Sequence, residues 1–226
     1  MLNKPRMKLS IVIPVLNEGD GLLSFLQALP DPDSAMEIIL ADGGSSDGSL
    51  SHAASRVSRV IVSEKGRAHQ MNAGAAVAAG DYLLFLHADT YLPEGFKSLI
   101  QQEAADWGRF DVRLSGDHWA FRMIEFMMNW KSGKTGICTG DQAIFIKRNL
   151  FESLGGYAAI PLMEDIEMTD RLRKICKPLR VRTPLTTSSR RWEEAGILKT
   201  MLLMWYLRIR YAMGASPDIL VKQYYK

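Results

Sequence analysis

The sequence predicts an α/β fold built around one mostly parallel sheet, and three observations support this prediction. Short apolar runs recur through the first half of the chain, and the run at 82–86 is typical of a strand buried on both faces. Segments typical of helices separate these runs. Acidic residues, including Asp42 and Asp89, follow two of the runs, at the sheet edge where open α/β sheets bind ligands.

The first half of the chain alternates strands with helices. Its predicted elements are, in order, a strand over 9–15, a helix over 21–29, a strand over 36–40, a glycine- and serine-rich loop over 41–48, a strand over 57–62, an alanine-rich helix over 66–79 and a strand over 81–87. Asp20 and Asp47 are placed to cap helices. Gly74 predicts that the alanine-rich helix packs closely on the sheet. This alternation is typical of a Rossmann-like sheet flanked by helices.

The second half of the chain departs from this alternation. Its predicted elements are a strand over 107–114, a helix over 118–130 rich in methionine and aromatic residues, a strand over 143–146, a helix over 148–154, a helix that follows 161–165 and runs through 174, and an amphipathic helix over 197–213. Within 107–114, apolar residues alternate with Arg109, Asp111 and Arg113, which predicts one solvent-exposed face.

Composition limits the class of protein. The chain has 226 residues, 47% of them hydrophobic, which is enough for one sizeable core and one domain. The formal net charge of +3 gives no indication of a nucleic acid partner. Cys138 and Cys176 lie far apart, so a reduced, cytoplasmic compartment is expected. The apolar run at 9–16 is short and interrupted by proline, so we expect neither a signal peptide nor a membrane span.

Three acidic groups lie at predicted strand ends or helix starts: Asp42, Asp89 and the pair Glu164 and Asp165. One carboxylate at such an edge can accept hydrogen bonds from a base or ribose, and another can hold a divalent metal that bridges phosphate oxygens. Each residue also has an ordinary structural explanation. Asp42 and Asp89 suit turns, and the Glu164–Asp165 pair suits the first turn of a helix.

Five segments, taken in order, resemble the inverting glycosyltransferases of family two, which have the GT-A fold. The segments are Ile11-Val12-Ile13-Pro14-Val15-Leu16-Asn17-Glu18, Asp42-Gly43-Gly44-Ser45-Ser46-Asp47-Gly48, Gly66-Arg67-Ala68-His69-Gln70-Met71-Asn72-Ala73-Gly74, His87-Ala88-Asp89 and Glu164-Asp165. The resemblance extends from about 9 to about 192. The sequence is most similar to a compact bacterial subgroup labelled arsenosugar-biosynthesis glycosyltransferases.

The resemblance implies a role for each matched residue. The nucleotide-sugar-binding residues would be Pro14, Asn17, Glu18, Asp42, Arg67, Asn72 and His87. Asp42 would bind the base or ribose, Arg67 would face the base or the diphosphate, and Asn72 would brace the pocket. Asp89 would hold Mn²⁺ or Mg²⁺ as the second acid of the Asp-x-Asp motif. Asp165 would be the general base, with Glu164 beside it.

Two positions depart from the family pattern. His87 stands where the first acid of Asp-x-Asp is usual, so the resemblance leaves metal dependence open. The His87 ring is expected either to donate to ribose or phosphate or to ligate a softer metal, and a hydrogen-bonded histidine at a strand end is the structural alternative. Ser188-x-x-Arg191-Trp192 replaces the Gln-x-x-Arg-Trp of processive polymer synthases, so non-processive transfer is expected. Candidates for the acceptor side are Trp119, Trp130, Asp141, Gln142, Arg191 and Trp192.

The resemblance also divides the single predicted domain, 1–226. A nucleotide-binding half over 1–106 precedes an acceptor and catalytic half over 107–195, and 196–226 forms a C-terminal helical extension and tail. We expect the extension to pack over the acceptor side of the site, with a homodimer contact or a peripheral contact on the inner face of a membrane as alternatives for the basic helix 197–213.

The function implied is inverting transfer of a sugar from a nucleoside-diphosphate sugar to an acceptor hydroxyl, with a lipid-linked molecule among the acceptors considered. Two alternatives stay open on the sequence. A nucleotidyltransferase on a similar sheet would release pyrophosphate, and a non-catalytic nucleotide-sugar-binding scaffold at a membrane would release no product.

Overall fold

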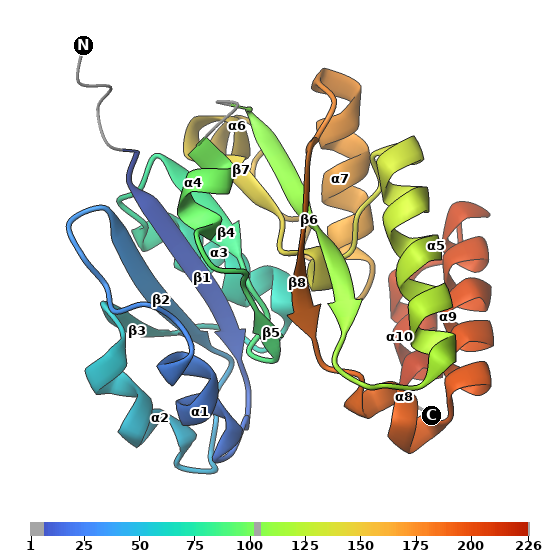
Figure 1. The fold of residues 1–226 in the computed structure, drawn as a ribbon, viewed down its shortest axis with the longest axis horizontal. Helices are drawn as coiled ribbons and strands as arrows, with labels where there is room; N and C mark the ends of the chain where they lie inside the picture. Colours follow the sequence, from blue (N-terminus) through green and yellow to red (C-terminus); the bar gives the residue numbers. More distant parts are fainter. Residues whose placement is uncertain (1–6, 102–104, 226) are drawn as a thin grey trace.

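The computed structural model describes residues 7–101 and 105–225, which fold around an eight-stranded sheet with the strand order β3-β2-β1-β4-β7-β6-β8-β5 (Figure 1). The strands are β1 (Leu9–Val15), β2 (Met36–Asp42), β3 (Arg59–Val62), β4 (Tyr82–Phe85), β5 (Thr90–Tyr91), β6 (Trp107–Leu114), β7 (Phe145–Lys147) and β8 (Leu179–Thr187). Helices cover both faces of the sheet, so the α/β class predicted from the sequence is confirmed.

The helices alternate with the strands in the first half and cluster at one end of the sheet in the second. The α-helices are α1 (Gly21–Gln27), α2 (Ser49–Ala53), α3 (Arg67–Val77), α4 (Phe96–Gln101), α5 (Trp119–Thr135), α6 (Arg148–Ser153), α7 (Glu164–Ile175), α8 (Arg190–Ala195), α9 (Ile197–Ala212) and α10 (Pro217–Tyr224). Two 3₁₀ turns, η1 (Ala54–Arg56) and η2 (Gly140–Gln142), complete the set of helical elements. No helix in the described part of the chain is both long and apolar enough to cross a bilayer.

The first half of the sheet is parallel. β1 pairs with β2 and β4, and β2 pairs with β3, all in parallel. Every residue of β1, β2 and β4 is buried, as expected for parallel strands covered on both faces. The strand ends therefore lie along one edge, where Val15 pairs with Asp42 and the chain leaves β4 toward Asp89. The predicted order of elements in this half is confirmed, with boundaries moved by a few residues.

The second half of the sheet is mixed, and two of its strands were not predicted. β7 pairs antiparallel with both β4 and β6, β8 pairs parallel with β6, and β5 pairs antiparallel with β8. β8 contains Pro184, a residue that weakens the sequence signal for a strand, and the register of β8 on β6 is irregular between Phe110 and Val112. The short helices α8 and α10 were not predicted either.

The solvent-exposed face predicted for the 107–114 strand is wrong for Arg109 and Asp111, whereas Arg113 is exposed as predicted. Arg109 is fully buried and Asp111 nearly so, because α5 packs against β6. The Arg109 guanidinium pairs with the Asp111 carboxylate and also donates to the Asn129 carbonyl of α5, and Arg180 of β8 donates to both oxygens of Asp111. Arg109 and Asp111 therefore alternate with apolar residues because they form a buried ion network with Arg180, and not because they face water.

Close packing of α3 on the sheet, predicted from Gly74, is confirmed. A Cβ at Gly74 would lie 2.3 Å from Val12 Cγ1 of β1. We therefore expect Gly74→Ala to lower the free energy of unfolding by about 1–3 kcal/mol, because the added methyl forces α3 away from β1. Chemical denaturation measures this change.

Gly21→Ala is the matched control, because Gly21 opens α1 and a Cβ there meets no atom within 4 Å. That substitution is expected to be neutral or stabilising by about 0.4–1 kcal/mol, since it lowers the entropy of the unfolded chain. Equal effects of the two substitutions would contradict the close contact between α3 and β1.

Candidate active site

A cavity of about 230 Å³ opens beyond the carboxyl ends of β1 and β4. Its floor is formed by residues that follow these two strands, and its walls by the N-terminal turns of α3 and α7, the 3₁₀ turn η2, and the helices α5, α8, α9 and α10. The wall on the α5 and α9 side lies at the right of the molecule in Figure 1. The cavity thus joins the parallel half of the sheet to the C-terminal helices.

Ten of the residues singled out from the sequence line this cavity: Pro14, Glu18, Arg67, His87, Asp89, Asp141, Glu164, Asp165, Arg191 and Trp192. They come from segments that are far apart in the sequence. Parallel pairing brings the first strand and the fourth strand to the same edge, and the antiparallel strand β7 brings η2 beside them. The fold therefore gathers four of the five sequence motifs around one space, and the 42–48 motif does not line it.

Four other candidates do not line the cavity, and each bonds to another part of the chain. Asp42 accepts hydrogen bonds from the backbone N–H and the hydroxyl of Ser45, and Asn17 accepts one from the N–H of Ser46. Asn72 exchanges two hydrogen bonds of 2.8 Å with the Tyr157 backbone. Gln142 is buried and donates to the hydroxyl of Ser132. Trp119 and Trp130 point to solvent on the outer side of α5.

Asp165 lies in the first turn of α7, where the helix dipole favours a negative charge. One carboxylate oxygen accepts a hydrogen bond of 2.8 Å from the N–H of Gly140, and the other accepts one from the N–H of Ile166. These bonds fix the orientation of the carboxylate at the cavity. Met163, directly before the helix, has a left-handed backbone with φ 71°, which turns the chain into α7.

Gly140 is crowded on its other side by His87. A Cβ at Gly140 would lie 2.5 Å from His87 Cε1, so only glycine allows the ring to lie against this turn. His87 Nδ1 lies 3.4 Å from an Asp141 carboxylate oxygen. Burial raises the pKa of Asp141, but the contact with His87 and the charges of Arg67 and Arg208 outweigh it, so the pKa lies below its usual range.

Arg67 begins α3 and provides positive charge among the acidic groups. Desolvation lowers the pKa of Arg67, but the charges of Tyr224, Glu164 and Asp141 raise it by more. The net pKa is therefore above its usual value, and the guanidinium stays charged. Glu164 is buried, and its surroundings favour the neutral form of its side chain. Desolvation and the charge of Asp165 raise the pKa of Glu164 above its usual range, although Arg67 opposes them.

Several cavity residues were not found from the sequence, and Tyr224 and Arg208 are two of them. The Arg191 guanidinium stacks 3.7 Å from the centre of the Tyr224 ring and bonds to its hydroxyl, so α10 closes one side of the cavity. No motif surrounds Tyr224, and the helix that carries it was not predicted. Arg208 had a weak signal, since it lies on the same side of α9 as Met204, four residues earlier, and both line the cavity.

The donor set suits a hard divalent cation completed by substrate oxygens. Asp89 and Glu18 both line the cavity, and burial together with the charge of Asp89 raises the pKa of Glu18. Mg²⁺ and Mn²⁺ in phosphate sites commonly take only one or two carboxylates from the protein. Within residues 7–101 and 105–225 no group of three or more histidine, cysteine, aspartate or glutamate side chains forms a complete metal site.

Comparisons with known proteins agree in the family that they indicate. The family model described as "Glycosyl transferase family 2" matches residues 10–152. A "PGL/p-HBAD biosynthesis glycosyltransferase" of Mycobacterium bovis is 31% identical over 166 residues, covering 66% of this chain and 62% of that protein. An "Undecaprenyl-phosphate 4-deoxy-4-formamido-L-arabinose transferase" of Sodalis glossinidius is 34% identical over 146 residues, covering 56% of this chain and 45% of that protein.

A solved structure extends the likeness to the fold. The mannosyltransferase PcManGT of Pyrobaculum calidifontis, in complex with GDP-Man and Mn²⁺, superposes with a TM-score of 0.61 at 19% identity, covering 81% of this chain and 56% of that one. The chain therefore spans between about half and three fifths of the length of these proteins, and the likeness to the solved structure concerns the fold alone.

The raised pKa of Glu164 predicts a pH dependence of stability. A carboxyl whose pKa is raised in the folded state binds its proton more tightly there than in the unfolded chain. Ionisation of Glu164 therefore opposes folding, an effect absent below its ordinary pKa of 4.5 and growing as the pH rises through the raised value. We expect the melting temperature of Glu164→Gln, relative to wild type, to increase from about pH 4.5 to about pH 8.

Thermal melting of both proteins across this pH range measures the difference. Glu194→Gln serves as control, because Glu194 is exposed on α8, and its difference from wild type should stay constant with pH. A constant difference for Glu164→Gln as well would show that its carboxyl is not destabilised by burial and by Asp165.

Proposed function

Because the chain belongs to glycosyl transferase family 2, we propose that it transfers a sugar from a nucleoside-diphosphate sugar to an acceptor hydroxyl, with inversion at the anomeric carbon. The GT-A fold expected from the sequence is confirmed by the family match and the structural likeness. One observation carries the proposal: a single cavity holds a fixed carboxylate at Asp165 together with the Arg67 cation and the acidic groups Asp89 and Glu18. The closer likeness to the arsenosugar subgroup stays a prediction.

The donor would bind on the side of β1, β2 and α3. In this proposal the nucleoside lies beside Pro14 and Glu18, and Asp42 and Asn17 shape its pocket by holding the 42–48 loop through Ser45 and Ser46. Asn72 braces the same region through Tyr157. The solved relative binds GDP-Man, a molecule of the class proposed here. Arg67, next to the cavity, suits the negative charge of a diphosphate.

A divalent metal is proposed beside Asp89, with Glu18 as the neighbouring carboxylate. When bound, Mn²⁺ or Mg²⁺ supplies positive charge that stabilises the diphosphate as a leaving group. His87 takes the place of the usual first acid, and we propose that its ring, oriented by Asp141, donates to the ribose or phosphate of the donor.

Asp165 is the proposed general base. An acceptor hydroxyl has a pKa far above 7 and attacks slowly unless a positioned base removes its proton. The bonds from Gly140 and Ile166 hold the Asp165 carboxylate toward the cavity, where it takes that proton as the oxygen attacks the anomeric carbon opposite the diphosphate. Arg67 offsets part of the charge that develops on the leaving group.

The acceptor side is proposed around Asp141, Arg191 and Trp192, with Gln142 supporting η2 from behind. Ser188, where processive synthases carry glutamine, also lines this part of the cavity and supports non-processive transfer. A lipid-linked acceptor agrees with the name of one relative, the undecaprenyl-phosphate 4-deoxy-4-formamido-L-arabinose transferase of Sodalis glossinidius. The cytoplasmic location inferred from two cysteines stays a prediction, as does the division into halves at 106 and 195; both cysteines are free in the structure.

Ligand-induced stabilisation tests the donor and metal proposals together. A ligand that binds only the folded state raises the melting temperature. At a ligand concentration of a hundred times the dissociation constant, it increases the free energy of unfolding by about 2.7 kcal/mol. We expect one of the UDP-, GDP-, CDP- or dTDP-sugars to raise the melting temperature only when Mn²⁺ or Mg²⁺ is present. The shift should disappear in Asp89→Ala and persist in Asp20→Ala, an acid near α1 outside the cavity.

If the shift occurred without metal and Asp89→Ala retained it, donor binding would not depend on a metal. His87 would then mark a metal-independent member of the family. Absence of a shift with every nucleotide sugar would contradict the donor proposal.

Substitution of the proposed base tests the transfer step. Asp165→Asn keeps an oxygen that can accept the Gly140 hydrogen bond but cannot take a proton at neutral pH. We expect transfer to fall by about 10²–10⁴-fold while the donor-induced thermal shift is unchanged. Asp170→Asn, an ion-paired surface acid on the same helix, should retain activity.

Product analysis with the wild-type enzyme separates the alternatives. Release of a nucleoside diphosphate and an inverted glycoside supports the proposal, whereas release of pyrophosphate would identify a nucleotidyltransferase. Undiminished transfer by Asp165→Asn would remove Asp165 as the base.

A further inference from the structure

Helix α9 is apolar on nearly all sides, although only one side of it is covered. Toward the protein, Leu207 is buried and Met204 lines the cavity. Its outer side carries five large apolar residues at helical spacing, between 44% and 77% exposed: Leu198, Leu202, Trp205, Ile209 and Met213. A helix of this composition is normally buried all round, so its outer side lacks a partner in the single chain.

Helix α5 shows the same division. Phe121 and Ile124 are buried against β6, whereas the opposite side carries four large residues between 43% and 71% exposed: Trp119, Met123, Phe126 and Trp130. The expectation that the C-terminal extension packs over the acceptor side of the site therefore holds only for the inner side of α9, and α5 likewise faces the cavity only through its inner side. Their outer sides present tryptophan, phenylalanine and methionine to solvent.

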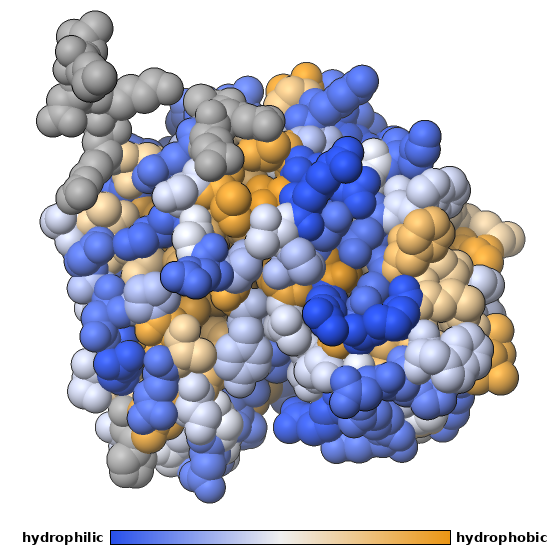
Figure 2. Space-filling view, viewed as in Figure 1, coloured by the Kyte–Doolittle hydropathy of each residue, from blue (hydrophilic) through white to orange (hydrophobic). Residues whose placement is uncertain are grey.

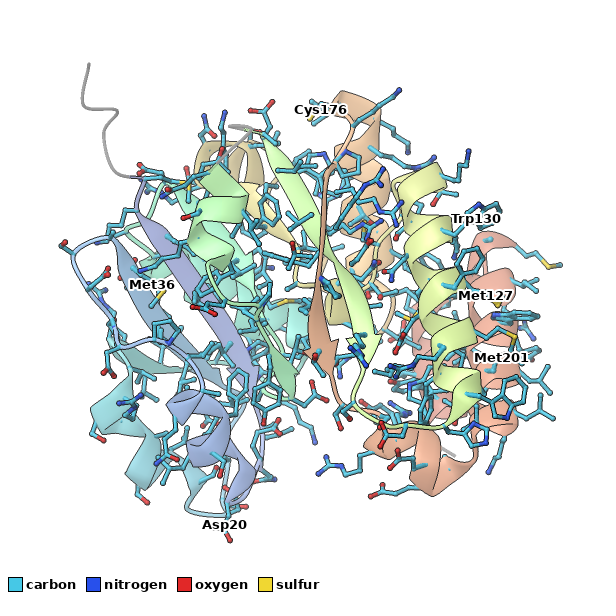
Figure 3. All side chains as sticks on the ribbon, in the orientation of Figure 1. Asp20, Met36, Met127, Trp130, Cys176 and Met201 are labelled. Atoms are coloured by element: carbon cyan, nitrogen blue, oxygen red, sulfur yellow. The ribbon has the colours of Figure 1, made fainter. Side chains whose placement is uncertain are left out.

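The two outer sides belong to one surface. Ile197 at the start of α9 packs against the cluster that contains Phe121 and Ile124 of α5, and Lys131 of α5 lies close enough to Arg208 of α9 for that charge to lower its pKa, together with burial. Met127, Trp130 and Met201 lie along the same edge in Figure 3, and hydrophobic atoms gather at that edge in Figure 2. We call the nine exposed residues of the two helices the α5–α9 face.

Charge distinguishes between the partners that this face could bind. α5 and α9 together carry six basic residues but only one acid, Glu125. Arg122 pairs with Glu125, and Arg208 lines the cavity with Lys131 close to it, which leaves Lys134, Lys199 and Arg210 as the basic residues of these helices beside the face. A two-fold contact with a second copy would bring these basic groups against each other, which opposes association. An apolar, tryptophan-containing face with a basic surround instead matches the interface of a bilayer that contains anionic lipids.

The α5–α9 face is also connected with the candidate active site. Met128 of α5 and Met204 of α9 line the cavity from the inner sides of the same helices, and Leu162, Met163 and Ile166 continue this apolar wall beside Asp165. An acceptor that enters along this wall meets apolar side chains on its way to the Asp165 carboxylate, with Thr200 and Arg208 of α9 among the polar groups beside it. Such a path suits an amphiphile whose hydroxyl is near its polar end.

From these observations we propose that the α5–α9 face binds the surface of an anionic bilayer and that the acceptor is a hydroxyl-bearing amphiphile of that bilayer. The second part rests on the proposed transferase function, and the first does not. Binding in this orientation places the apolar wall of the cavity beside the lipid surface, so that the acceptor need not cross water.

Vesicle flotation tests the bilayer contact without any catalytic step. The wild-type chain is expected to float with vesicles made of equal parts phosphatidylcholine and phosphatidylglycerol, and to bind phosphatidylcholine vesicles more weakly. The double variant Leu202→Glu/Ile209→Glu should bind at least about tenfold more weakly, since it places charges in the apolar interface. The matched control Val62→Glu/Ile175→Glu changes two exposed apolar residues outside the face and should bind like wild type.

A second variant tests the charge contribution and guards against an effect on folding. Lys199→Glu/Arg210→Glu leaves the apolar residues intact and should weaken binding to the anionic vesicles by at least about tenfold, because each basic residue near such a surface contributes about fivefold. High salt should reduce wild-type binding to the same vesicles.

The proposal is overturned if the wild type does not float with anionic vesicles, or if Leu202→Glu/Ile209→Glu floats as well as wild type. A dimer in analytical ultracentrifugation that this variant dissociates, without vesicle binding by wild type, would assign the face to a second copy and also overturn it. Donor-induced thermal shifts are measured in parallel. Loss of flotation with those shifts retained refutes the bilayer contact and leaves the transferase proposal intact. Flotation without any donor shift refutes the transferase proposal, and with it the amphiphilic acceptor, but leaves the bilayer contact intact.

Discussion

The parallel pairing of β1 with both β2 and β4 is the constraint on which the candidate site depends. It places the end of β1, the 42–48 loop and the turn after β4 at one edge of the sheet, although more than seventy residues separate the first from the last. The pairing tolerates little change, because Gly74 leaves no room between α3 and Val12. Arg67, at the start of the same helix, is thereby held at the cavity.

Much of the parallel half could be predicted from the sequence. Buried parallel strands are short continuous apolar runs, and polar residues follow them abruptly, so the end of each strand is easy to locate. The mixed half could not. Its strand β8 contains Pro184 and pairs with β6 across seventy residues, so local patterning carries little information about it. Arg109 misled the prediction for a related reason. A charge in an alternating strand indicates a solvent-exposed position unless its buried partner is known, and here that partner is Asp111, which also pairs with Arg180.

The candidate site shows the same division between local and long-range information. Residues inside motifs, such as Asp89 and Asp165, were identified because their neighbours in sequence mark them. Tyr224 has no such neighbours, and it reaches the cavity only because α10 folds back against Arg191. Asp42 illustrates a different limit, since the sequence located it at the correct edge while its carboxylate bonds to Ser45 and does not line the cavity.

The architecture of α5 and α9 explains why one pair of helices can serve both the cavity and the surface. A helix that is polar outside and apolar inside can only cover a core, whereas these helices use Met128 and Met204 inward and aromatic or aliphatic residues outward. A change of acceptor chemistry in the cavity and a change of affinity at the surface would therefore involve the same two elements. A face with a purpose unrelated to transfer could be formed by any exposed helices. Here it is formed by the two helices that also line the cavity beside Asp165. That shared use favours a surface that delivers the acceptor over one that merely holds the protein in place.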